Sequence, residues 1–185
     1  MYKTWLAVVL ISCLASCSSS RKTPALPAAS TLVVDGKIWS SLFQQRAAEY
    51  KALCWQAFNI AHERVDEVTA TPAARPRAII TDIDETFLDN SPYAVHRALK
   101  GLDYDPASWN EWTGKGSADT LPGALGFFKY AASKHIEIFY ITNRYEKERA
   151  GTLANLQRFG FPFADNQHLI LRQDASSKET RRQMV

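Results

Sequence analysis

Two acidic residues at the end of a short apolar run constrain this chain more than any other feature. Residues 78–81 read Ala-Ile-Ile-Thr, and Asp82 and Asp84 follow them. A buried strand that ends in ionised carboxylates is unfavourable unless those carboxylates have a partner, a metal ion or a reaction to serve. The pattern is typical of phosphoryl chemistry, in which one aspartate attacks phosphorus, the other moves a proton, and a cation such as Mg²⁺ screens their repulsion. A strand followed by an ordinary acidic turn is the alternative.

A second strand is predicted at residues 136–141, which read Ile-Glu-Ile-Phe-Tyr-Ile and lead into Thr142, Asn143 and Arg144. A strand, a polar tip and a helical pattern make the βα unit of a parallel sheet, whose ligands bind at the carboxyl ends of the strands. The hydroxyl, amide and guanidinium at this tip can hydrogen-bond phosphate oxygens. Thr142 or Asn143 can also cap the next helix, and both roles are compatible because a helix N-terminus attracts anions.

These motifs resemble those of the haloacid dehalogenase (HAD) superfamily. Residues 82–86, Asp-Ile-Asp-Glu-Thr, are similar to its first motif, and Thr142 is similar to its second. Four further segments narrow the resemblance to the class C acid phosphatases, the bacterial lipoprotein 5′-nucleotidases: residues 88–93, 109–112, 122–123 and 140–144. The resemblance begins near Ile38 and implies an α/β, Rossmann-like HAD fold with a parallel sheet, a short lid and an N-terminal helix.

The resemblance also implies roles for individual residues. Asp82 matches the nucleophile that forms an aspartyl-phosphate, and Asp84 matches the general acid that later activates water. Mg²⁺, or another divalent cation, would be held by the Asp82 carboxylate, the main-chain carbonyl of Asp84 and a further Asp. Thr142 and Asn143 would bind phosphate. Lys178 lies where the family's third-motif lysine is expected, and there it would bind phosphate and offset the charge of phosphate and nucleophile; a solvated helix residue is the alternative.

The family's fourth motif, a strand followed by Gly-Asp-Asn and a further Asp, has no counterpart in these residues. No Asp follows Asp174, and the helix expected at residues 176–184 runs almost to Val185. One magnesium ligand and the strand beside the Asp82 strand are therefore missing. We interpret the sequence as a C-terminally truncated member of the family, with a partial phosphatase core at residues 77–185.

The implied activity is that of a metal-dependent phosphomonoester hydrolase, an acid phosphatase or 5′-nucleotidase. Residues 87–121 are too long for a plain βα loop and are expected to form a lid. Trp109 is a candidate to stack on the ring of a nucleoside or nicotinamide monophosphate, while Trp112 is expected to pack the lid onto the core. Two alternatives remain: a catalytically silent surface lipoprotein that binds a ligand, and a phosphotransferase that uses the same intermediate.

The amino terminus predicts export and lipid anchoring. Residues 1–16 carry one charge and a short apolar run, as in a secretory signal peptide, and Cys17 follows Leu-Ala-Ser as in a lipoprotein cleavage site. Residues 17–36 would then be a lipidated cysteine and tether, and Ser18 favours the outer membrane. Loss of Lys3 lowers the net charge from +3 to +2, which is too small to indicate a nucleic-acid polymer as partner.

Residues 37–70 are expected to form an N-terminal helical segment. Apolar residues recur at the spacing of an amphipathic helix over residues 38–65. The stripe consists of Trp39, Phe43, Ala47, Tyr50, Cys54, Ala57 and Ala61. We expect it to pack on the catalytic core, with Cys54 as an inert core residue; a coiled coil with a partner is the alternative. Further helices are expected at 124–133 and 146–159, and a third strand at 168–171.

Overall fold

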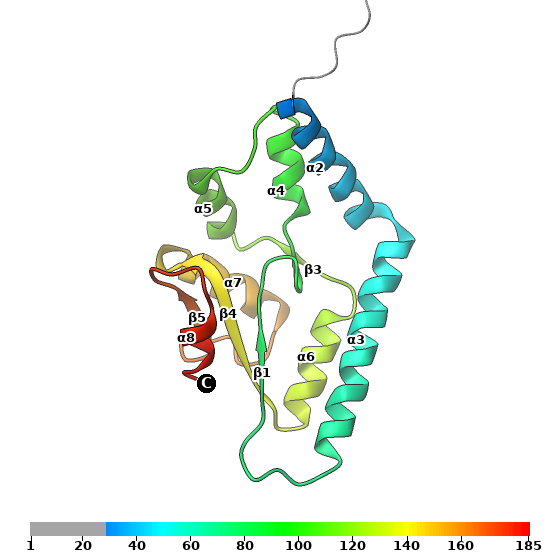
Figure 1. Cartoon of the computed structure of the whole chain (residues 1–185), viewed down its shortest axis with the longest axis vertical. Coiled ribbons are helices and arrows are strands. Elements are labelled where there is room, and N and C mark those ends of the chain that lie inside the picture. Colours follow the sequence, from blue (N-terminus) through cyan, green and yellow to red (C-terminus); the bar gives the residue numbers. More distant parts are fainter. Residues whose placement is uncertain (1–28) are drawn as a thin grey trace, which may run out of the picture.

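Two long helices open the part of the chain that the computed structural model describes, residues 29–185 (Figure 1). They are α2 (Ala29–Arg46) and α3 (Ala48–Thr69). The expectation of one continuous helix over 38–65 is wrong, because the backbone at Ala47 is extended, with φ −72° and ψ 129°. The break lets the two helices pack on different partners: α2 lies against α4, and α3 lies against α6.

A three-stranded parallel sheet carries the predicted strands. The strands are β1 (Ala78–Thr81), β4 (Glu137–Tyr145) and β5 (Leu169–Arg172), in the order β1-β4-β5. Thr81 of β1 lies beside Tyr140 of β4, so both strands point their carboxyl ends to the same edge. As expected without the neighbouring strand, β1 is the edge strand of the described sheet, with one neighbour, and it is less buried than its apolar sequence suggests, since Ile80 is 40% exposed. The predicted parallel α/β architecture is confirmed.

Between β1 and β4 the chain forms a helical cap above the carboxyl edge of the sheet, where the sequence predicted a lid (Figure 1). It consists of β2 (Leu88–Asp89), α4 (Ser91–Ala98), α5 (Pro106–Gly114) and β3 (Asp119–Thr120). The strands β2 and β3 pair antiparallel and close its base. The Asp105 carboxylate accepts the main-chain N–H of Ser108 at 2.8 Å, which caps α5 and fixes where this helix begins.

The remaining elements are α6 (Ala124–Ser133), the 3₁₀ turn η1 (Glu146–Glu148), α7 (Arg149–Phe159) and α8 (Glu179–Arg182). The predicted helix at 124–133 is confirmed. The strand predicted at 136–141 is longer than expected, because β4 continues to Tyr145. Thr142 and Asn143 therefore lie inside a strand and cap no helix; the capping box that opens η1 is formed by Tyr145 and Glu148. The last helix is shorter than the predicted 176–184.

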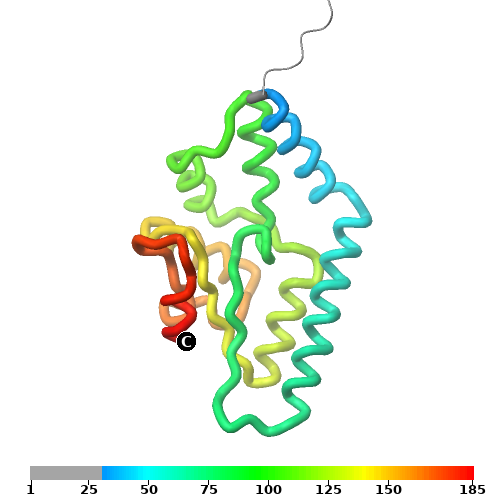
Figure 2. The backbone as a smooth tube through the Cα atoms, in the orientation of Figure 1, coloured from blue at the N-terminus to red at the C-terminus, as the bar shows by residue number. Residues whose placement is uncertain are grey.

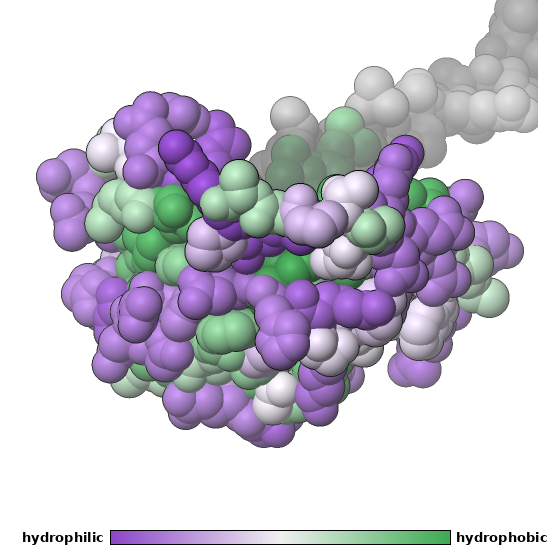
Figure 3. All heavy atoms as spheres, turned by 90° about the horizontal axis from the view of Figure 1, so that it is seen from below, coloured by the Kyte–Doolittle hydropathy of each residue, from purple (hydrophilic) through white to green (hydrophobic). Residues whose placement is uncertain are grey.

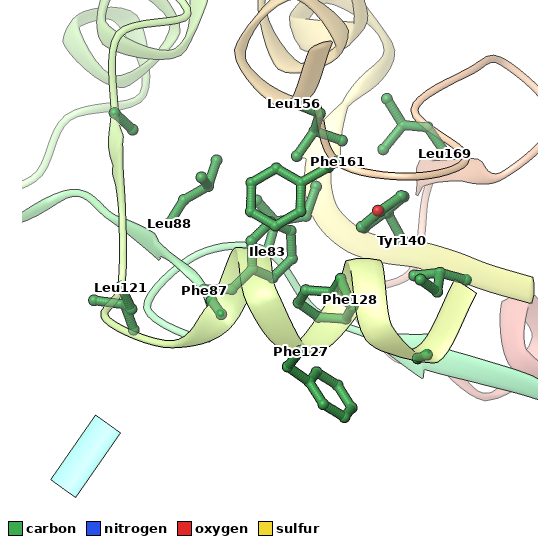
Figure 4. Close-up of a cluster of buried hydrophobic side chains, with 14 of the residues drawn as sticks. Ile83, Phe87, Leu88, Leu121, Phe127, Phe128, Tyr140, Leu156, Phe161 and Leu169 are labelled. Atoms are coloured by element: carbon green, nitrogen blue, oxygen red, sulfur yellow. The ribbon is translucent and has the colours of Figure 1, made fainter. Parts of the chain in front are cut away.

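The core lies between the sheet, α6 and the α7 side of the molecule. Phe87 is fully buried and contacts Phe128, Tyr140 and Phe161, with ring centroids 4.9 to 5.7 Å apart (Figure 4). The C-terminal part of the N-terminal stripe joins this core as predicted, and Cys54, the one free cysteine among the described residues, packs against it. The N-terminal part of the stripe does not, since Trp39 and Phe43 are exposed.

The chain passes from the lower end of α3 around the bottom of the molecule into β1 (Figure 2). Seen from that end, the surface is mostly hydrophilic with apolar patches between the charged side chains (Figure 3). Within residues 29–185, no helix combines the length and the apolar character that crossing a membrane requires.

Candidate active site

The residues predicted to act together meet at the carboxyl edge of the sheet. Asp82 and Asp84 follow β1 directly, and Thr142 and Asn143 lie near the end of the neighbouring strand β4. Lys178, which lies about a hundred residues after Asp82 in sequence, brings its Nζ to 2.6 Å from Asp82 Oδ2. A parallel sheet gathers such distant groups because all its strands end on the same side.

Asp82 is the accessible carboxylate of the pair. Its Oδ1 accepts the main-chain N–H of Ile83 at 2.8 Å, and its side chain is 39% exposed. Ile83 itself is fully buried, so the backbone that carries Asp82 is fixed by the core. The Lys178 ammonium supplies a positive charge beside the carboxylate. This arrangement leaves an oxygen-rich group open to solvent next to a cation, which is what a phosphate-directed nucleophile requires.

Asp84 is held by an ion pair and an amide. The Arg144 guanidinium donates to both carboxylate oxygens, with Nη2 2.6 Å from Oδ1 and Nε 3.1 Å from Oδ2. The Asn90 amide donates to Oδ1 at 2.9 Å. The Arg144 side chain is only 1% exposed, so a bidentate charge-assisted pair is formed in a poorly hydrated environment. Asp84 is therefore fixed in one orientation beside Asp82.

The position of Arg144 corrects one prediction and qualifies another. From the sequence, its guanidinium was expected to bind phosphate. In the structure it donates to Asp84 and, through Nη1, to Thr152 Oγ1 at 3.1 Å. Thr142 is fully buried, and its hydroxyl accepts the main-chain N–H of Arg144 at 3.2 Å. The proposed phosphate-binding role of Thr142 stays a prediction.

Asn143 is exposed, and a second arginine supports it. Arg181 of α8 donates to Asn143 Oδ1 at 2.8 Å and to the main-chain carbonyl of Thr142. Burial lowers the pKa of this guanidinium, and the nearby Arg172 shifts it in the same direction. Arg181 therefore ties α8, the helix that begins after Lys178, to the end of β4, and it keeps Lys178 close to Asp82.

Two hydrogen-bonded routes connect the cap to these residues. Trp112 Nε1 donates to Asn90 Oδ1 at 2.8 Å, and the Asn90 amide reaches Asp84. Thr113 Oγ1 donates to Glu148 Oε1 at 2.9 Å, while the second Glu148 oxygen accepts the main-chain N–H of Tyr145 at 2.7 Å. Helix α5 is thus bonded both to the acidic pair and to the end of β4.

The site also contains a carboxyl with a perturbed pKa. The pKa of Glu85 is raised above its usual value, first by desolvation and then by the negative charge of Asp84. Its Oε1 accepts the main-chain N–H of Asn90 at 3.1 Å, and its φ of 56° lies in the left-handed region. A tight turn therefore follows Asp84 and leads the chain back into the cap.

Trp109 lies where the cap meets the sheet. Its ring contacts Tyr93 edge-on at 5.1 Å between centroids and Tyr104 at 6.1 Å. The Arg144 guanidinium carbon is 5.9 Å from the ring centre. Trp112, in contrast, packs against the core as predicted. The aromatic cluster of Tyr93, Tyr104 and Trp109 therefore lies next to the Arg144 guanidinium, which binds Asp84.

The donors for a divalent cation are incomplete in the residues that the structure describes. Asp82 can supply a carboxylate oxygen and Asp84 a main-chain carbonyl, both of which are hard ligands suited to Mg²⁺. However, no group of three or more His, Cys, Asp or Glu side chains within residues 29–185 is arranged to hold a metal ion. The described residues therefore do not form a complete metal site.

Sequence reasoning missed the residues that position the acidic pair. It assigned no role to Asn90, Glu148 or Arg181, and it gave Arg144 a different partner. Asn90 lies in residues 88–93, one of the segments that resemble the family, so the sequence did mark it as a candidate site residue. Glu148 follows β4 by three residues and looked like an ordinary acidic residue at the start of a helix. Only the long-range packing of α5 and α8 reveals these roles.

The chain is similar to known acid phosphatases over most of its length. A family model described as HAD superfamily, subfamily IIIB (acid phosphatase) matches residues 2–185. The chain is 36% identical over 95 residues to acid phosphatase 1 of Solanum lycopersicum, which covers 50% of this chain and 36% of that protein. It is 31% identical over 118 residues to a stem 31 kDa glycoprotein of Glycine max, which covers 64% of this chain and 44% of that protein.

Solved structures show the same relationship. The class C acid phosphatase from Bacillus anthracis with tungstate bound superposes with a TM-score of 0.79 at 37% identity. A second structure of the class C acid phosphatase from Bacillus anthracis gives a TM-score of 0.78. Each superposition covers 82% of this chain and 64% of the other. The chain thus spans less than half the length of the two curated relatives above and 64% of these solved chains.

Proposed function

The chain belongs to the acid phosphatases of HAD superfamily subfamily IIIB, and on this premise we propose that it is an enzyme that hydrolyses phosphomonoesters through Asp82. The observation that carries the proposal is the pairing of an accessible Asp82 carboxylate with Lys178 at 2.6 Å, next to a firmly positioned Asp84. A nucleophile, a charge-neutralising cation and a proton-transfer group at one sheet edge support phosphoryl transfer better than any structural role.

In the proposed reaction a carboxylate oxygen of Asp82 bonds to phosphorus while the bond from phosphorus to the leaving oxygen breaks. In its protonated form Asp84 gives a proton to that leaving oxygen, and the carboxylate that remains pairs with Arg144. Water then attacks the aspartyl-phosphate, Asp84 takes a proton from it, and inorganic phosphate leaves. Lys178 offsets the charge on Asp82 and on the phosphoryl oxygens throughout.

The substrate proposed is a nucleoside or nicotinamide monophosphate, in line with the family resemblance. The aromatic cluster of Tyr93, Tyr104 and Trp109 supports a substrate that carries a planar ring.

A divalent cation, Mg²⁺ by the resemblance, is proposed as a requirement for activity. Removal with EDTA should abolish turnover, and Mg²⁺ should restore it. Full activity in EDTA would refute the requirement.

The central test of the function is Asp82→Asn. The amide is nearly the same size as the carboxylate but is a poor nucleophile, so kcat on p-nitrophenyl phosphate should fall at least about a thousandfold. Asp174→Asn, which removes an exposed charge outside the acidic pair, should leave kcat unchanged. Near-wild-type turnover by Asp82→Asn would refute the assignment. No turnover by the unmutated protein would favour the silent ligand-binding lipoprotein.

A phosphotransferase is the second enzymatic candidate, because an alcohol can replace water as the acceptor of the aspartyl-phosphate. Product analysis separates the two activities. Hydrolysis releases one inorganic phosphate for each p-nitrophenol. If a sugar is present and phosphate release falls while p-nitrophenol release does not, the enzyme transfers the phosphoryl group.

We also propose that the protein is exported and anchored to the outer membrane through Cys17, which lies outside the described residues. The short apolar run and the Leu-Ala-Ser-Cys sequence that ends at Cys17 support this anchor. Wild-type protein should incorporate labelled palmitate in bacteria, and Cys17→Ser should not. Cys13→Ser is the matched control, because Cys13 would leave with the signal peptide, and it should keep the label. Labelling of Cys17→Ser would refute this anchor.

A further inference from the structure

Helix α2 has two faces in different environments. On the inner face, Ser41 is 1% exposed and Gln45 donates to the Ser91 hydroxyl of α4 at 2.9 Å. Lys37 forms an ion pair with Asp103, in the loop before α5. The inner face is therefore covered by the cap, against which α2 lies (Figure 1).

Three large apolar side chains lie on the outer face, where Asp35 is also exposed. Leu32, Trp39 and Phe43 are spaced by seven and four residues, so they lie on one side of the helix, opposite Ser41. Their exposed fractions are 61%, 69% and 45%, and Leu42 beside them is 47% exposed. Single exposed apolar residues are ordinary, but a row of large ones along one helix face marks an interaction site. We call Leu32, Trp39 and Phe43 the outer strip.

The outer strip ends with α2. After the break at Ala47, α3 also exposes Leu53, Trp55 and Ile60, but its outward positions are interrupted by the exposed polar residues Gln56, Glu63 and Glu67. A coiled coil needs three to four heptads of continuous apolar spacing, which this strip does not provide. A short helix with an apolar face and a central tryptophan instead suits the interface of a lipid bilayer, where tryptophan can bury its ring and keep its N–H hydrated.

We propose that the outer strip of α2 rests on the surface of the lipid bilayer that anchors the chain. The location rests on the lipidated Cys17 proposed above. Only residues 18–28 separate Cys17 from α2, and a fully extended stretch of that length spans no more than about 40 Å. Helix α2 is the first described element after the anchor and is too polar on its inner face to insert, so it lies along the bilayer.

Contact of α2 with the bilayer has a consequence for the whole site. The inner face of α2 is bonded to α4 and, through Lys37, to the loop before α5. A bilayer that holds the outer strip therefore fixes the orientation of the cap, and with it the opening through which substrate reaches Asp82.

The first experiment uses the chain from residue 18 onward, which lacks the anchor but keeps every residue that the structure describes. Vesicles of phosphatidylethanolamine and phosphatidylglycerol with brominated acyl chains quench tryptophan at the bilayer surface. Subtracting the emission of Trp39→Phe and of Trp55→Phe isolates each ring. Trp39 should be quenched at least about twofold, and Trp55, which is 54% exposed on α3, should not. Equal quenching of both rings, or of neither, would overturn the proposal.

The second experiment measures cosedimentation with the same vesicles. Replacing Leu32, Trp39 and Phe43 by Gln should lower the partition constant at least about tenfold, because three large side chains leave the bilayer. The matched control replaces Leu53, Trp55 and Ile60 by Gln and should change it less than about twofold. Unchanged cosedimentation of the outer-strip variant, with a melting curve that shows both variants folded, would refute the proposal.

A second copy of the chain is the competing occupant. Sedimentation velocity without vesicles should give a monomer for the wild-type chain from residue 18. A dimer that the outer-strip variant abolishes would replace the bilayer with a self-association surface. If Cys17 is not the anchor, the full chain will incorporate no palmitate. The vesicle experiments use the chain from residue 18, so their result does not depend on that outcome.

Discussion

At the scale of single residues, the distinctive feature is the way Asp84 is held. Arg144 neutralises its charge, and Asn90 fixes one of its oxygens. Removing one partner of a buried ion pair leaves an uncompensated charge, which costs about 3–5 kcal/mol and is more than the pair itself contributes. Direct substitution of Arg144 therefore mixes folding with catalysis. A substitution of Trp112 perturbs Asp84 less directly, because Trp112 reaches this carboxylate only through its hydrogen bond to Asn90.

We predict that Trp112→Phe lowers kcat about tenfold and leaves KM nearly unchanged. Phenylalanine keeps most of the packing but removes the N–H that Asn90 Oδ1 accepts, so Asn90 is free to rotate away from Asp84. A lost hydrogen bond of about 1–1.5 kcal/mol corresponds to that factor when it acts in the transition state. Steady-state kinetics on p-nitrophenyl phosphate, with a melting curve for each protein, measures the effect.

The double variant tests whether the effect passes through Asn90. Asn90→Ala alone should lower kcat at least as much as Trp112→Phe, and adding Trp112→Phe to it should do little more, since both changes act on one chain of hydrogen bonds. Trp55→Phe, on α3, should leave both constants unchanged. A full additional tenfold loss in the double variant would contradict the route.

These residues also mark the limit of sequence reasoning. The family resemblance placed Lys178 where a third-motif lysine is expected, and in the structure its Nζ lies 2.6 Å from Asp82 Oδ2. The partner of Arg144 did not follow, because it depends on the register of β1 against β4 and on how far β4 extends. A guanidinium at a strand tip satisfies a carboxylate or a phosphate equally well in sequence terms, and only the packed structure distinguishes them.

At the scale of elements, the close approach of α7 to α5 holds the cap on the core. An added Cβ at Gly151 of α7 would lie 2.3 Å from the main-chain oxygen of Thr113, which real side chains do not tolerate. Thr113 is also the residue whose hydroxyl bonds Glu148. Gly151 is thus required by the contact between two helices and not by its backbone conformation.

We predict that Gly151→Ala destabilises the protein by roughly 1–3 kcal/mol, because α5 must move away from α7. Gly126→Ala in α6 is the matched control: an added Cβ there meets nothing within 4 Å, so it should stabilise the protein by roughly 0.5–1 kcal/mol. Urea unfolding followed by circular dichroism measures both. Equal effects of the two substitutions would show that the α5–α7 contact is not tight in solution.

The predicted elements failed where local sequence and tertiary packing disagree. Apolar spacing continues from α2 into α3, so a single helix was expected, but the two halves pack on different partners and the chain breaks at Ala47. Polar residues suggested that the second strand ends at Ile141, but β4 continues past an irregularity and Tyr145 still pairs with Arg172 of β5. Periodicity identified the elements, while their ends were set by long-range contacts.

At the scale of the whole molecule, the candidate site lies between two layers. The sheet layer supplies Asp82, Asp84 and Lys178, and the cap supplies Asn90 and Trp109. Figure 1 shows the cap above the sheet. The fold class was predictable because strands and helices alternate along the core. The cap was predictable only as an insertion, since the packing of α2 on α4 links segments with no common sequence pattern.

The position of Trp109 between these layers leads to a prediction about substrate choice. If its ring stacks on a base, Trp109→Ala should lower kcat/KM for a nucleoside 5′-monophosphate by roughly 5- to 150-fold, the equivalent of about 1–3 kcal/mol. A small aliphatic phosphate has no ring to lose, so its kcat/KM should hardly change. Trp109→Phe, which keeps an aromatic face, should give an intermediate loss on the nucleotide alone. Should Trp109 serve only to pack Tyr93 and Tyr104, both substrates would suffer equally and the melting temperature would fall as for a large-to-small substitution in a core. That outcome would remove the ring from the substrate and leave the nucleotide preference without support from the cap.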